Sequence, residues 1–142
     1  MATSIRKTKR RRGAAIVEFA VIAPVLVFLS LGMMEMGRGI MVKDNLTDAA
    51  RVGCRTAIMP SATNTSVTSD INTSLTANNI APSNVTVQIL VDGVVKDVSA
   101  ANTGSKISVM VSIPVSKLAW ITPRFLPASA VESEVVVMRS LK

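Results

Sequence analysis

The longest feature of the hydropathy pattern is an apolar run close to the N-terminus. From Ala14 to Met34, twenty-one residues carry a single charge, on Glu18. As a helix, a run of this length crosses the roughly 30 Å of hydrocarbon in a bilayer. The pattern therefore predicts a transmembrane helix over about residues 14–36.

Helical periodicity continues beyond the apolar run. Small or apolar residues recur at steps of three and four at Val42, Leu46, Ala49, Ala50, Gly53 and Ala57. Within this stripe Ala49, Gly53 and Ala57 form a row of small residues, which allows another backbone to come close. The row can pack on the protein's own sheet or on another subunit. Pro24 is expected to kink the membrane part of the helix or to loosen one hydrogen bond. With Pro60 as its end, the helix is predicted over residues 14–59.

Residues 60–142 have the pattern of a small α+β domain outside the membrane. A short helix is expected over residues 69–78, followed by strands over 85–91, 106–115 and 131–139. Asp92-Gly93 is a hairpin signal, so a further strand is expected over 94–98. That strand would place Lys96 on the apolar face, which favours a bulge or a longer loop. The predicted fold class is α+β, with the long helix packed on a small antiparallel sheet.

Most of the net charge of the chain lies in its first twelve residues. The protein has 16 basic and 9 acidic residues, for a formal charge of +7. Six of the basic residues precede Gly13, and no acidic residue accompanies them. This distribution is typical of the cytoplasmic flank of a membrane helix. A nucleic-acid-binding arm would be expected to interleave aromatic residues, so no nucleic-acid partner is predicted.

The composition argues against an enzyme. The chain has no histidine and one cysteine, which excludes histidine-based catalytic triads, common metal clusters and an internal disulfide. We expect no catalytic residue, no metal site and no cofactor. Cys54 has three interpretations: a small packing residue, an intermolecular disulfide or a reactive thiol.

Glu18 is the residue that ordinary membrane segments do not explain. A cleaved secretory signal has a shorter apolar core and a small-x-small cleavage site, which this run lacks. A plain signal anchor fits the length but gives Glu18 only the role of a tolerated interfacial acid. If the chain were cut after Gly13, the new amino group of Ala14 would lie about one turn from Glu18. Neighbouring subunits could then pair the ammonium of one chain with the carboxylate of the next, which would set their register.

The segment "RRRGAAIVEFAVIAPVLVFLSLGMMEMGR" resembles the start of TadE-like pseudopilins of the tight-adherence (Flp/Tad) pilus machinery. In that family a Gly-x-x-x-x-Glu-Phe/Tyr motif, a proline in the apolar helix and a Glu-x-Gly-Arg motif recur. The matching residues are Gly13, Glu18, Phe19, Pro24, Glu35, Gly37 and Arg38. The later segments "NLTDAARVGCRTA" and "ESEVVVMR" also resemble family members.

The resemblance implies a pilin-like fold and a pilus-assembly function. It implies that a prepilin peptidase removes the leader, residues 1–13, by cutting between Gly13 and Ala14. Glu18 and Phe19 would then be assembly contacts. The expected partners are other pilin and pseudopilin subunits, the inner-membrane assembly machinery and the lipid bilayer. The N-terminus would be cytoplasmic, and residues 60–142 would lie outside the bacterial cytoplasmic membrane. The alternative is an uncleaved single-pass signal anchor whose outer domain binds a protein partner.

Overall fold

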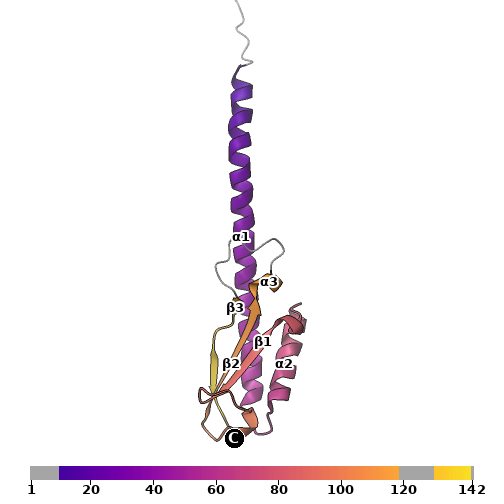
Figure 1. Ribbon diagram of the computed structural model, residues 1–142, viewed down its shortest axis with the longest axis vertical. Coiled ribbons are helices and arrows are strands. Elements are labelled where there is room, and N and C mark those ends of the chain that lie inside the picture. The colour runs from indigo at the N-terminus through magenta and orange to yellow at the C-terminus, as the bar shows by residue number, and fades with distance from the viewer. Residues whose placement is uncertain (1–9, 119–129, 142) are drawn as a thin grey trace, which may run out of the picture.

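The computed structural model describes residues 10–118 and 130–141 (Figure 1). One long helix, α1, extends well beyond a compact head formed by the rest of the described chain. The elements in order are α1 (Arg10–Ala57), α2 (Asn64–Ala77), 3-10 turns at Pro82–Asn84 and Val98–Ala100, β1 (Thr86–Val91), β2 (Lys106–Pro114), α3 (Val115–Leu118), β3 (Ala130–Glu132) and β4 (Val136–Arg139).

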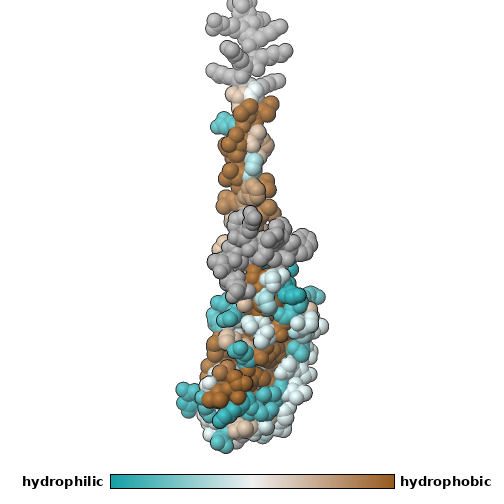
Figure 2. All heavy atoms as spheres, viewed as in Figure 1, coloured by the Kyte–Doolittle hydropathy of each residue, from teal (hydrophilic) through white to brown (hydrophobic). Residues whose placement is uncertain are grey.

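The N-terminal half of α1 is a bare apolar rod. Large apolar side chains such as Phe19, Phe28 and Met34 are exposed along it, and Figure 2 shows this apolar surface above the head. By length and composition α1 can cross a membrane from Gly13 onward. The predicted architecture, a long apolar N-terminal helix packed on a small antiparallel sheet, is therefore confirmed. Its bounds differ slightly from residues 14–59, since the described helix begins at Arg10 and a turn follows Ala57.

The sheet is built around β2. β1 pairs with one edge of β2, and β3 and β4 share the other edge, all antiparallel. Because side chains alternate along a strand, Ile107, Val109, Val111 and Ile113 of β2 point to one face, where they are buried. This face packs on α1. Pro114 lies at the end of β2, as its missing N–H donor requires.

The C-terminal half of α1 is the centre of the core. It contacts the sheet and also α2, which lies beside it in Figure 1. Gly53, in the middle of the row of small residues, faces Ile71 and Val67 of α2. Ala49 and Ala57 in the same row are fully buried. Gly53 thus packs within the chain, against α2 and not against the sheet.

Two predicted elements differ from the observed structure: a helix in its bounds and a strand that is absent from the described residues. The helix expected over residues 69–78 begins at Asn64, because Thr63 accepts a hydrogen bond from the backbone N–H of Ser66 and Ser66 caps Thr63 in return. The strand expected over 94–98 does not form. Asp92 and Gly93 adopt the positive φ angles of the predicted turn, but only Val94 pairs back, with Val91. The chain then leaves the sheet, and Lys96 stays exposed instead of entering the apolar face.

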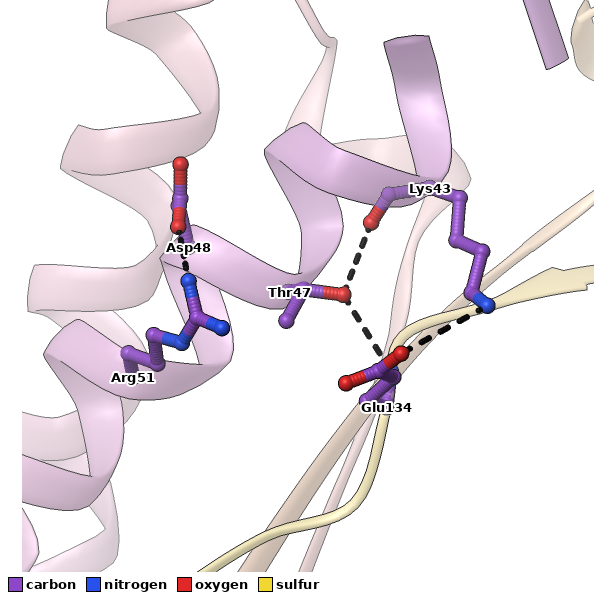
Figure 3. A network of polar contacts seen from close by, with 5 residues as sticks. All are labelled: Lys43, Thr47, Asp48, Arg51 and Glu134. Carbon is purple, nitrogen blue, oxygen red and sulfur yellow. Dashed lines mark hydrogen bonds and ion pairs between the residues drawn. The ribbon is translucent and has the colours of Figure 1, made fainter. Parts of the chain in front are cut away.

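The predicted strand over residues 131–139 is divided by a bulge. Residues 133–135 lie opposite only two residues of β2, so one residue is extra. The bulge leaves the backbone N–H of Val111 without a backbone acceptor across the strands. The Ser133 hydroxyl accepts a hydrogen bond from this N–H at 3.0 Å. The bulge also contacts α1: the Thr47 hydroxyl accepts the N–H of Glu134 at 3.2 Å, and the Glu134 carboxylate lies 3.8 Å from the Lys43 ammonium (Figure 3).

Candidate functional site

The expected cleavage and assembly residues all lie on the bare half of α1. Gly13, Ala14, Glu18 and Phe19 are exposed. A Cβ atom built on Gly13 would meet nothing within 4 Å. Glycine destabilises a helix by about 1 kcal/mol relative to alanine, so the helix unwinds more easily here than it would with alanine. The peptide bond after Gly13 is thus unobstructed by the rest of the described chain.

Glu18 is a lone acid on an apolar surface. It lies four residues after Ala14, a rise of about 6 Å along the helix. Its neighbours Val17, Phe19 and Val21 are each about two-thirds exposed. The Glu18 carboxylate makes no hydrogen bond or ion pair with the side chains that the structure describes, which begin at Gly13. A carboxylate within a membrane costs about 2.5–3.5 kcal/mol at the bilayer centre and less near an end, so this group gains from a cationic partner.

Pro24 lies inside α1, and the helix continues through it without interruption. Because proline has no N–H, the carbonyl of Ala20 loses its usual donor, which is the loosened hydrogen bond expected from the sequence. Further along, the Ser30 hydroxyl donates to the Leu26 carbonyl at 2.8 Å. The Ser30 hydroxyl is thus satisfied within the helix itself.

Glu35 lies at the other end of the apolar segment. One of its carboxylate oxygens, Oε2, is buried and has no hydrogen-bond partner in the described part of the chain. Seventeen residues of helix separate Glu35 from Glu18, about 25 Å, so the two carboxylates cannot act on one substrate. Among the described residues, no group of three or more His, Cys, Asp or Glu side chains is arranged to hold a metal ion.

Cys54 lies in the core and not at a site. The residue is fully buried, and its sulfur lies 3.3 Å from the carbonyl oxygen of Val136. Burial raises the pKa of the thiol above its ordinary value of 9.0 and outweighs the hydrogen bonds that lower it. A buried thiol with a raised pKa is a poor nucleophile. The structure therefore favours the packing interpretation over the disulfide and the reactive thiol.

Because of Cys54, the free energy of unfolding is expected to depend on pH in the alkaline range. Because the folded protein holds the thiol proton more tightly than the unfolded chain does, the free energy of unfolding should fall as pH rises above about 9. Denaturant unfolding of the full chain in detergent between pH 7 and 10 measures this dependence. The matched variant Cys54→Ala should lose less stability over the same range. Equal pH dependence in both proteins would contradict the buried thiol, as would rapid alkylation of the native protein at pH 8.

Comparison with known proteins identifies the same region of the chain. Residues 13–55 match the family model described as TadE-like protein. No curated protein and no solved structure matches the chain. The matched segment runs from Gly13 to near the end of α1, and it includes Glu18, Pro24 and Gly53. The resemblance seen in the sequence is therefore confirmed over this segment.

Proposed function

From the TadE-like segment at residues 13–55, we propose that this protein is a minor pseudopilin that takes part in assembling a Tad/Flp-type pilus. A prepilin peptidase cuts it between Gly13 and Ala14. Its N-terminus lies in the cytoplasm, α1 anchors it in the bacterial cytoplasmic membrane, and the head lies outside. The observation that carries the proposal is the exposed Glu18, unpaired and five residues after an unobstructed glycine, on a bare apolar helix.

The physical properties of α1 suit a subunit that exchanges lipid for other subunits. Its bare half presents apolar side chains in all directions, so it can contact lipid in the membrane and neighbouring helices in an assembly. Cleavage would create an ammonium at Ala14, one turn from Glu18. In a low-dielectric environment an unpaired charge is strongly unfavourable, so pairing between subunits would select one axial register. Other pilin and pseudopilin subunits and the inner-membrane assembly machinery are the proposed partners.

A second candidate is an uncleaved signal anchor whose head binds a protein partner in the envelope. It is favoured by the continuity of α1, which runs through Gly13 without a break from Arg10. An uncleaved anchor needs no glycine at residue 13 and gains nothing from Glu18, so the processed subunit is the better explanation.

Processing is tested by the intact mass and N-terminal sequence of protein extracted from its native membrane. The mature chain should begin at Ala14, and Gly13→Leu should leave the leader attached because the added side chain blocks the residue before the cut. Gly32→Leu is the matched control, since a Cβ there also meets nothing within 4 Å. A wild-type chain that keeps its leader while the peptidase is active would leave the signal anchor as the function.

Assembly is tested separately with Glu18→Gln, which keeps the size of the side chain and removes its charge. Cleavage should persist, whereas cross-linking to neighbouring subunits should fall at least tenfold because an ammonium would lack its partner. Glu132→Gln, an exposed acid on the head, is the control and should assemble normally. If Glu18→Gln cross-links as efficiently as the wild type, Glu18 is not an assembly contact.

A further inference from the structure

A groove of about 600 Å³ opens where α1 leaves the head. α1 from Met34 to Asn45 and the connection from α2 to β1 line it, and Ile113 of β2 and Lys117 of α3 complete the lining. These segments lie at the end of the head from which the N-terminal half of α1 emerges (Figure 1). Their residues are far apart in the sequence, so the groove exists only in the folded head.

The groove has the charge of an anion site. Arg38 of α1 and Lys117 of α3 line it, whereas no aspartate or glutamate is among its described lining residues. The side-chain amides of Asn45 and Asn84 add uncharged hydrogen-bond donors. Arginine binds phosphate through two parallel N–H donors, and lysine adds a point charge. A phosphate group therefore complements this lining.

The level of the groove along α1 matches the edge of a bilayer. A helix needs about 20 residues to cross the hydrocarbon, so a span that begins at Ala14 ends next to Met34, the first groove residue. Ile40 and Met41, at the same level as the groove, are 61% and 64% exposed. Apolar side chains this exposed favour contact with the membrane interface. The cations of the groove would then lie at the height of lipid headgroups.

We propose that this groove binds one anionic phospholipid of the membrane that α1 crosses. The lipid phosphate contacts Arg38 and Lys117, and the start of an acyl chain lies along Met34, whose flexible side chain adapts to it. The bound lipid fixes the head against the bilayer. The inference rests on the membrane anchoring proposed above, but it does not depend on leader cleavage or pilus assembly.

Native mass spectrometry of the full chain in a non-ionic detergent tests this site with phosphatidylglycerol, phosphatidylethanolamine and inorganic phosphate as probes. The test variant is Arg38→Gln/Lys117→Gln. The control is Arg55→Gln/Lys96→Gln, which removes the same charge from exposed positions outside the groove. Each basic residue near an anionic lipid surface contributes about a fivefold factor in affinity. The test variant should therefore bind phosphatidylglycerol about 25-fold more weakly, while the control binds like wild type.

Three outcomes would overturn the proposal. If both double variants bind phosphatidylglycerol equally weakly, the lipid is attracted by the overall charge of the protein and not by the groove. Displacement of the lipid by millimolar inorganic phosphate would mean a site for free anions. Unchanged lipid binding together with lost cross-linking to another subunit would mean that an acidic protein segment occupies the groove. Both substituted side chains are exposed, so the fold should persist, and equal unfolding midpoints verify this.

Failure of the lipid site is distinguishable from failure of the anchoring. Alkaline extraction of native membranes reports anchoring by itself, because it releases peripheral proteins and leaves spanning helices in place. Wild-type protein that resists extraction but shows no preference for phosphatidylglycerol would refute only the groove. Protein released by extraction would refute the anchoring and, with it, the lipid site.

Discussion

A fragment that begins at Met59 is expected to remain unfolded, whereas a fragment that begins at Arg38 should fold. The first lacks the five α1 side chains that are fully buried at the centre of the core: Leu46, Ala49, Ala50, Cys54 and Ala57. Without them, the buried faces of α2 and of the sheet are open to water. Burial of a single large aliphatic side chain contributes about 1.5–3 kcal/mol, and a whole domain is stable by only about 5–15 kcal/mol. The stabilisation lost with α1 therefore exceeds the free energy of unfolding of the head.

Circular dichroism and the dispersion of amide NMR signals distinguish the two fragments. The fragment from Arg38 keeps every α1 residue that the core uses, together with Lys43 and Thr47, which hold the bulge. It should melt cooperatively, and it loses only the bare apolar half of α1. A dispersed spectrum and a cooperative transition for the fragment from Met59 would show that α2 and the sheet form a core without α1, contrary to the packing described.

The substitution Gly53→Leu is expected to destabilise the head by at least about 3 kcal/mol. A Cβ at this position would lie 2.5 Å from Cδ1 and 2.6 Å from Cγ1 of Ile71, closer than real Cβ atoms approach their neighbours. Ile71 is itself fully buried, so it has no open space into which to move. The larger leucine side chain must therefore push α2 away from α1. Denaturant unfolding of the fragment from Arg38 measures the loss.

Two further variants isolate the contact at Gly53. Val52→Leu enlarges a half-exposed neighbour on the same turn and should change stability by no more than about 0.5 kcal/mol. Ile71→Ala removes both atoms that crowd residue 53. By itself this substitution should lower the free energy of unfolding by about 2–5 kcal/mol. In that background Gly53→Leu should cost less than it does alone. Strictly additive effects would mean that the strain at residue 53 arises elsewhere.

Local signals in the sequence were sufficient for the elements of the candidate site. The length of the apolar run predicts a membrane-spanning helix, and residues as near as Gly13 and Glu18 keep their relation in any continuous helix. Alternation alone was also enough for β2, because four apolar residues on one face demand burial. The end of β2 at Pro114 followed from the missing donor of proline. In each case the physical cause lies within a few residues of its effect.

Contacts between distant segments decided the rest. Asp92-Gly93 makes its turn, yet β1 pairs with β2 because β2 offers a continuous apolar face and residues 94–98 would bring Lys96 into it. The bulge at Ser133 lies where Thr47 and Lys43, more than 80 positions earlier, contact Glu134.

The same division applies to the surfaces of α1. From its own residues, α1 is one helix with a row of small side chains and an acid near its start. The path of the chain after residue 57 decides three further features. Gly53 packs on α2, the first half of α1 stays exposed, and Arg38 and Lys117 line the same groove. Periodicity specifies which face of a helix is apolar, but the partner of that face depends on packing among residues far apart in the sequence.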